Sequence, residues 1–169
     1  MTSQTDVGTP VVCKYFLKSE FLKGTFRFDP SSLNDEQIHQ ELTRFGHEHP
    51  NNPSVVWLGY SPTNRRKPVT WKHVPHISVR TLISKGLNPA WKPQLEAVNG
   101  NLYRFVKECQ STYKTEYDAS RSLSADLSLV IGIVHPGKGS EVELVDGSHR
   151  LASMILNNVE YVEGYLGYY

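Results

Sequence analysis

The sequence predicts an α/β (α+β) domain. Short apolar stretches rich in β-branched residues alternate with segments whose apolar side chains recur at helical spacing. The chain has 169 residues, a length that suits a single domain with one core spanning residues 1–169. It holds two cysteines, Cys13 and Cys109, which form no Cys-x-x-Cys unit and can make at most one bridge. We therefore expect two reduced, buried thiols rather than a disulfide framework or a cysteine zinc site.

The first third of the chain predicts strands around one clear helix. Residues 1–10 are expected to be disordered, and residues 11–28 carry two apolar stretches, VVCKYFL and TFRF, that suit strands. The stretch DPSSLNDEQIHQELTRFG predicts a helix that begins near Asn34 and ends at Gly46, with apolar residues at helical spacing. The β-branched and aromatic run SVVWLGY, residues 54–60, is typical of a buried strand.

The middle of the chain is less regular. Residues 61–73 form a basic segment punctuated by prolines, and we expect a loop there. Apolar residues in 76–86 lie on one helical face, and a second helical stripe follows in residues 102–109. The polar stretch 110–125 suits a connection that lies over the active face.

The last third has the clearest pattern. It predicts a strand at 127–135, a turn at HPGKG, a strand at 141–145, a helix at 149–157 and a strand at about 159–166. The tail EGYLGYY is most simply an edge strand that buries one face, with Tyr168 and Tyr169 available for a dimer contact.

Charge and hydropathy limit the partners that this protein can have. Eighteen Lys and Arg against seventeen Asp and Glu give a net charge of +1, so no global field attracts nucleic acid or anionic lipid. The start MTSQTDVGTP lacks a secretory signal, and the longest apolar run, 129–134, is far shorter than the ~20 residues that span a bilayer. We expect a cytoplasmic protein with no membrane partner.

The pentapeptide Asp146-Gly147-Ser148-His149-Arg150 is the strongest candidate for a functional site. It leaves a predicted strand and opens a predicted helix, where unpaired backbone N–H groups and the helix dipole favour an anion. Gly147 permits close approach of the main chain, Ser148 can cap the helix, and His149 and Arg150 add donors and positive charge.

Asp146 would repel a bare phosphate. Its position is easier to explain if it holds Mg²⁺ or takes a proton from a substrate hydroxyl, as a phosphoryl-transfer site requires. The alternative is that Asp146-Gly147-Ser148 forms an ordinary turn and helix cap, with His149 and Arg150 exposed to solvent.

The segment SLVIGIVHPGKGSEVELVDGSHRLASMILNNVEYVEGYLG resembles the closing half of the ParB/sulfiredoxin superfamily. The resemblance covers residues 127–167, roughly a quarter of the chain. It implies a small mixed β-sheet flanked by helices and a loop that binds the phosphates of ATP or CTP. It places Gly147, Ser148, His149 and Arg150 at the phosphate-binding positions, and Asp146 at the acidic position of kinase-like and nuclease-like members.

Two branches of that superfamily fit poorly. Sulfiredoxins carry a reactive cysteine where this chain has Ser148, and partition proteins carry Glu-Arg-Arg in this loop. The free-serine kinases use an early glutamate as base on the substrate hydroxyl. Glu20 is one candidate for that role, but the first 75 residues resemble nothing that would single it out.

Two other groups of residues are candidates for a site. Arg65, Arg66, Lys67 and Lys72 surround Trp71, and this basic loop can close over phosphates, stack on a base, or simply lie in solvent above a buried Trp71. The histidine clusters His47-Glu48-His49 and His73-x-x-His76 lack the spacing of a strong zinc site.

The sequence thus predicts a nucleotide-binding phosphoryl-transfer enzyme. It would use ATP or another NTP with Mg²⁺ as a kinase on a small hydroxyl-bearing acceptor, or as an NTP hydrolase. Asp146, His149 and Arg150 would be catalytic, with Asp146 as the metal ligand. One alternative is a ParB-like nuclease or nucleic-acid-binding protein, in which Arg65, Arg66 and Lys67 follow the strand. The other is a non-catalytic nucleotide sensor.

Overall fold

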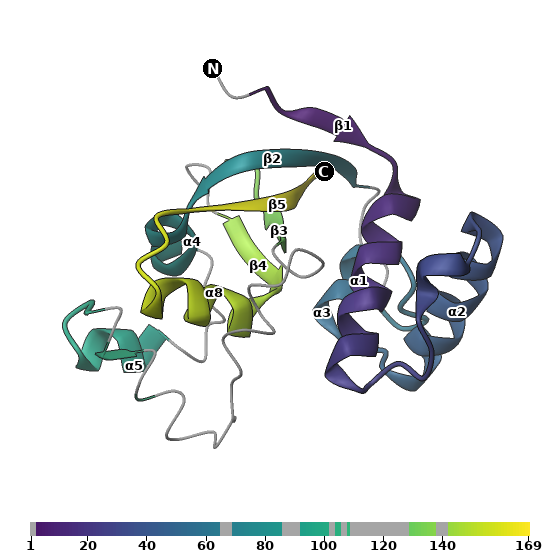
Figure 1. Ribbon diagram of the computed structural model, residues 1–169, viewed down its shortest axis with the longest axis horizontal. Coiled ribbons are helices and arrows are strands. Elements are labelled where there is room, and N and C mark those ends of the chain that lie inside the picture. Colours follow the sequence, from purple (N-terminus) through teal and green to yellow (C-terminus); the bar gives the residue numbers. More distant parts are fainter. Residues whose placement is uncertain are drawn as a thin grey trace.

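The computed structural model describes residues 3–64, 69–85, 92–101, 104–105, 108, 129–137 and 142–169. In this part of the chain, helices lie on both sides of a mixed five-stranded sheet (Figure 1). The predicted fold class is confirmed. None of the described helices is long and apolar enough to cross a bilayer.

Helix α1, Thr9–Lys23, replaces the first of the two strands predicted in residues 11–28. The second, TFRF, is not a strand either, because residues 25–28 form bends after the end of α1. Gly8 precedes it, Pro10 lies in its first turn, and Gly24 ends it in the left-handed conformation with φ 83°. Its buried residues follow helical spacing: Val12, Cys13, Phe16 and Leu17. The strand prediction was wrong because a short apolar run rich in β-branched residues fits a buried strand and a buried helix equally well.

Helix α2, Asp35–Glu48, confirms the predicted helix. Asn34 and Gln37 form a capping box, in which each side chain accepts a hydrogen bond from the other residue's backbone N–H. Gly46 does not end the helix, contrary to the prediction. It lies inside α2, where a Cβ atom would fall 2.2 Å from the Tyr60 carbonyl oxygen, so glycine is required for close packing.

Helix α3, Pro53–Trp57, occupies the segment that was predicted to be a strand. The Asn52 side chain accepts hydrogen bonds from the backbone N–H groups of Ser54 and Val55, and Pro53 takes the first helical position. These start signals outweigh the β-branched content of SVVWLGY. A short 3-10 helix, η1 at Pro30–Ser32, precedes α2.

The strands follow the order β1-β2-β5-β3-β4. β5 lies in the middle, antiparallel to β2 and parallel to β3, so the predicted edge position of the tail was wrong. The predicted strands at 127–135, 141–145 and 159–166 are confirmed within a few residues. The bounds are β1 Thr5–Val7, β2 Thr70–Ser78, β3 Val130–Val134, β4 Val142–Asp146 and β5 Tyr161–Tyr168.

Two further predictions need correction. The stretch 1–10 is not wholly disordered, because β1 pairs with β2 and α1 begins at Thr9. The expected basic loop at 61–73 also ends early, since β2 begins at Thr70. Most of residues 102–109, and all of 110–125, lie outside the described residues.

The remaining described helices are α4 Val79–Lys85, α5 Lys92–Ala97 and α8 Ser148–Leu156. α4 and α8 confirm the helices predicted near residues 76–86 and 149–157. Side chains of alternate residues on β3 point to opposite faces of the sheet, so the core has two parts. Ile131 and Ile133 pack with the α1–α3 side, whereas Val130 packs with α4 and α8.

Candidate functional site

The candidate loop joins β4 to α8 through a single glycine. β4 ends at Asp146, Gly147 has φ 104°, and α8 begins at Ser148. The backbone N–H of Leu151 donates to the Gly147 carbonyl oxygen at 2.8 Å, which closes the first turn of the helix. The strand–loop–helix arrangement predicted from the sequence is therefore present, and it places the amino terminus of α8 beside the end of β4.

Gly147 is required by its backbone and by its surroundings. Its φ of 104° lies in a region that L-residues rarely adopt. A Cβ atom there would lie 3.0 Å from Arg150 Nη2 and 3.0 Å from Val130 Cγ1. The Arg150 guanidinium therefore lies directly against the main chain of the loop.

Asp146 and Arg150 form a buried ion pair. Arg150 Nη2 donates to Asp146 Oδ2 at 2.7 Å, and both side chains are almost wholly excluded from solvent. The simple turn-and-cap alternative, with Arg150 exposed to solvent, is therefore wrong for Arg150. A buried arginine beside a carboxylate keeps its charge and its geometry, which fixes the position of both groups.

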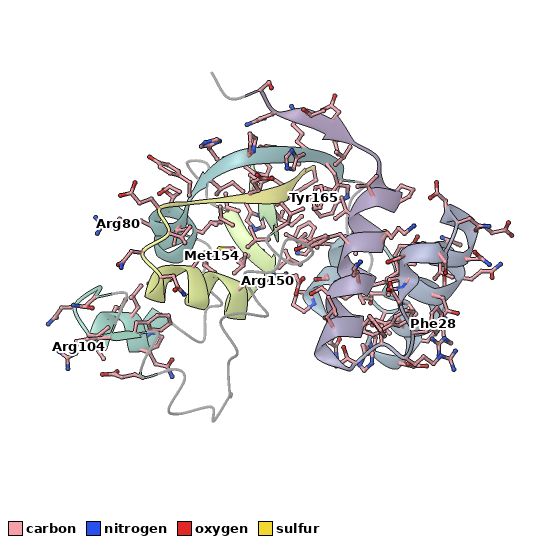
Figure 2. The ribbon with its side chains drawn as sticks, in the orientation of Figure 1. Phe28, Arg80, Arg104, Arg150, Met154 and Tyr165 are labelled. Atoms are coloured by element: carbon pink, nitrogen blue, oxygen red, sulfur yellow. The ribbon has the colours of Figure 1, made fainter. Side chains whose placement is uncertain are left out.

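Helix α1 supplies the other contacts of Arg150, and sequence reasoning missed them. Arg150 Nη1 donates to the buried Ser19 Oγ at 3.0 Å, and the guanidinium lies 5.6 Å from the centre of the Tyr15 ring. Figure 2 shows Arg150 between the amino-terminal end of α8 and α1. Tyr15 and Ser19 are four residues apart on one face of α1, a signal that is visible only once this segment is treated as a helix.

Tyr15 also secures the start of β3. Its hydroxyl donates to the Leu129 carbonyl oxygen at 2.7 Å and accepts from the Leu129 N–H at 2.9 Å. Burial raises the pKa of Tyr15 to about 12, although the nearby Arg150 charge acts in the opposite direction. Tyr15 is therefore a neutral hydrogen-bonding group at physiological pH, and its ring remains available to the Arg150 cation.

The other predicted residues of the loop are placed only in part. Ser148 occupies the first position of α8 and is half-buried. His149 lies in the first turn of the helix, and its side chain is outside the described part of the structure. Both residues therefore have the predicted position on the backbone, at the amino terminus of a helix of nine residues.

The basic residues are not shown to join this loop. Residues 65–67 lie outside the described ranges. Lys72 lies on β2, with its Nζ atom 5.5 Å from the centre of the Tyr168 ring, and two strands separate β2 from β4. Trp71 is 2 % exposed and is part of the core, as the alternative with a buried Trp71 had it; its position relative to residues 65–67 lies outside the described ranges. A role for Trp71 in stacking on a base is excluded by that burial.

Glu20, the candidate early glutamate, is buried on α1 directly after Ser19. Its carboxylate accepts a hydrogen bond from the Thr25 hydroxyl, and its backbone carbonyl accepts from the N–H groups of Thr25 and Phe26. These contacts give Glu20 a role in the turn that ends α1.

The histidine clusters do not form a metal site in the part of the chain that is described. His49 packs against the Phe45 ring, and His73 lies 3.1 Å from Glu163. Among the described residues, no three His, Cys, Asp or Glu side chains gather as metal ligands would. Cys13 is buried and unbridged, and burial raises its pKa to about 12, as expected of an inert thiol, while Cys109 lies outside the described residues.

The donor set suits a phosphate better than a metal held by the protein alone. The loop offers a positive-φ glycine, the amino terminus of α8 and an adjacent guanidinium. Its one carboxylate, Asp146, is already paired with Arg150. Mg²⁺ is commonly held by one or two carboxylates together with phosphate oxygens and water. Asp146 is therefore the one carboxylate of the loop that could serve as a ligand for such an ion.

Comparison with known proteins finds no matching family model, curated protein or solved structure.

Proposed function

We propose that this protein binds the phosphates of ATP or another nucleoside triphosphate, with Mg²⁺, at the 146–150 loop, and that it transfers or hydrolyses the terminal phosphate. The acceptor is a small hydroxyl-bearing molecule or water. The observation that carries the proposal is the junction at Gly147, where a strand, a positive-φ glycine and a helix amino terminus meet beside a buried guanidinium.

Each residue of the loop has a role in this proposal. The amides of Gly147 and Ser148 cradle phosphate, and Arg150 with His149 neutralises the charge that develops on the transferred group. Asp146 orients the acceptor hydroxyl and accepts its proton. The metal, when bound with the nucleotide, supplies charge neutralisation on the phosphate oxygens.

A non-catalytic nucleotide sensor is the second candidate, and one observation favours it. Asp146 is buried and paired with Arg150, so the carboxylate that would act on an acceptor is engaged within the protein. A sensor needs the phosphate cradle without that carboxylate. The two candidates differ in turnover and agree on binding.

Ligand-dependent melting tests the proposal directly. A panel of ATP, CTP, GTP and short oligonucleotides, each with Mg²⁺, should show a rise in melting temperature with at least one nucleotide, because a ligand that binds only the folded state stabilises it. A rise with oligonucleotides alone would reject the proposal in favour of a nucleic-acid-binding protein. Nucleotide binding without release or transfer of phosphate would select the sensor.

Substitution of Arg150 should weaken triphosphate binding. We expect Arg150→Ala to raise the Kd by about tenfold to a hundredfold, the range for loss of a hydrogen bond to a charged group. Calorimetric titration measures this, with Arg44→Ala as control, because Arg44 lies on α2 and pairs with Glu41 and Glu48. Circular dichroism must show that the variant is folded, since removal of one partner leaves Asp146 buried without its cation.

Substitution of Asp146 separates binding from turnover. Asp146→Asn keeps the shape of the side chain but removes the base, so the variant should still bind nucleotide while phosphate release or transfer falls to background. A discontinuous phosphate assay measures the loss. Equal turnover in the variant and the wild type would remove Asp146 from the mechanism.

A further inference from the structure

Both terminal nitrogens of the Arg150 guanidinium are engaged inside the protein. Nη2 is bonded to Asp146 and Nη1 to Ser19, and the plane of the group lies near the Tyr15 ring. Arginine binds a phosphate most strongly when two N–H groups donate to it together. A phosphate that takes both terminal nitrogens therefore competes with Asp146 and Ser19 for them.

Arg150 is close enough to the loop for such an exchange. Its Nη2 atom lies 3.0 Å from the position that a Cβ atom on Gly147 would occupy. The contacts that hold it come from two elements: strand β4 through Asp146, and helix α1 through Ser19 and Tyr15. The guanidinium is thus held by weak links to α1 and one strong link to Asp146.

We propose that Arg150, Asp146, Ser19 and Tyr15 form an autoinhibitory latch, in which a phosphate displaces the Asp146 carboxylate as the anionic partner of Arg150. This inference rests on the proposed function and describes its regulation. In the latched state the positive charge of Arg150 is neutralised within the protein. When phosphate takes the guanidinium, Asp146 is released and its carboxylate faces the acceptor hydroxyl.

The latch couples nucleotide binding to the release of the Asp146 carboxylate from Arg150. It also makes α1 part of the regulation, because Ser19 stabilises the latched state and makes no contact that the phosphate site requires. Ser19 is accordingly a positioning residue. The apparent affinity for phosphate is reduced by the fraction of molecules in which Arg150 is available, so weakening the latch raises affinity.

Calorimetric titration of Ser19→Ala with ATP–Mg²⁺ and with inorganic tripolyphosphate tests the latch. We expect the Kd of both to fall by up to about tenfold, which corresponds to a latch that is closed in about 90 % of wild-type molecules. Damage to the fold does not produce tighter binding, so a gain in affinity distinguishes the latch from a merely structural contact. Ser61→Ala is the matched control, because Ser61 is also buried and donates to the Pro50 carbonyl oxygen instead.

Two further variants test the other contacts of the latch. Asp146→Asn should also tighten binding, because the neutral amide holds Arg150 less strongly. In an Arg150→Ala background, Ser19→Ala should have no effect on the Kd, since the residue that Ser19 positions is gone. Folding of each variant is checked by circular dichroism, and Ser19→Ala alone suffices if Asp146→Asn does not fold.

The outcomes separate the two proposals. If the wild type binds neither probe and no variant does, the proposed function fails and the latch fails with it. If the wild type binds but Ser19→Ala binds equally or more weakly, the latch is rejected and the proposed function stands. A gain for Ser19→Ala that persists without Arg150 would also reject the latch, because the effect would not pass through the guanidinium.

Discussion

Tyr15 uses both its hydroxyl and its ring to join α1 to the rest of the protein. The hydroxyl satisfies the N–H and the carbonyl oxygen of Leu129, which directly precedes β3. The ring contacts the Arg150 guanidinium on one hand and packs edge-on against Tyr165 of β5 on the other. One residue of a helix thereby stabilises two strands and the candidate loop.

Tyr15→Phe removes the hydroxyl and keeps the ring. We expect the free energy of unfolding to fall by about 1–3 kcal/mol, the cost of leaving partly buried backbone groups without their partner. Urea denaturation measures the change, and Tyr161→Phe is the control because Tyr161 is 56 % exposed. Equal stability of Tyr15→Phe and the wild type would show that water replaces the hydroxyl at no cost.

At the scale of the element, β5 depends on glycine for its central position. A Cβ atom on Gly164 would lie 2.8 Å from the Val130 carbonyl oxygen, and one on Gly167 would lie 2.5 Å from Val69 Cγ1. Both are closer than atoms can approach without displacement. The tail EGYLGYY therefore forms an interior strand because its glycines let side chains and backbone of the neighbouring segments pack against it.

Gly164→Ala tests this requirement. The backbone oxygen of Val130 cannot rotate away from a new methyl group as a flexible side chain would, so we expect a loss of about 1–3 kcal/mol of stability. Glu163→Ala on the same strand is the control: Glu163 is largely exposed, its contact with His73 lies at the surface, and its loss should change stability little. Thermal and urea unfolding of both variants provide the comparison.

In the whole molecule, contacts between residues far apart in the sequence connect the amino-terminal helices to the carboxy-terminal sheet. Arg150 bonds to Ser19, Tyr15 bonds to Leu129, and Ser54 Oγ donates to the Val145 carbonyl oxygen at 3.4 Å. Around them, two apolar clusters lie on opposite faces of the sheet. We expect the described helices and strands to unfold as one cooperative unit.

Alkaline pH should destabilise this unit. Burial raises the pKa of Cys13, Tyr15 and Tyr60 to about 12, from ordinary values of 9.0 for the thiol and 10.0 for the phenols. In the unfolded chain these groups ionise at their ordinary pKa, whereas in the folded protein they stay neutral. The contribution of these groups to the free energy of unfolding should therefore stay constant below pH 9 and fall as the pH rises toward about 12.

Urea unfolding at several pH values between 8 and 12 measures this loss. The double variant Tyr15→Phe/Tyr60→Phe removes two of the three groups and should show a shallower decline. A decline of equal slope in that variant would mean that other groups control the alkaline transition.

Local sequence signals were sufficient to predict the elements that are bounded by turn or cap residues. In the last third, apolar strands are separated by Pro-Gly and Asp-Gly turns, and the strand–loop–helix at 146–150 was predicted from those residues alone. The helix at Asp35–Glu48 is equally predictable, because the two residues of its capping box, Asn34 and Gln37, are only three positions apart in the sequence. In both cases the determining contacts join residues only a few positions apart.

Tertiary structure decided what local signals left open. The apolar run that became α1 fits a strand as well as a helix, and packing against the sheet and α2 selected the helix. The central place of β5 required partners that lie far away in the chain. At the site, the sequence by itself determined that Asp146, Gly147 and Arg150 belong together, because they are neighbours. Only the fold brought Ser19 and Tyr15 to Arg150, since contacts between residues more than a hundred positions apart leave no local pattern.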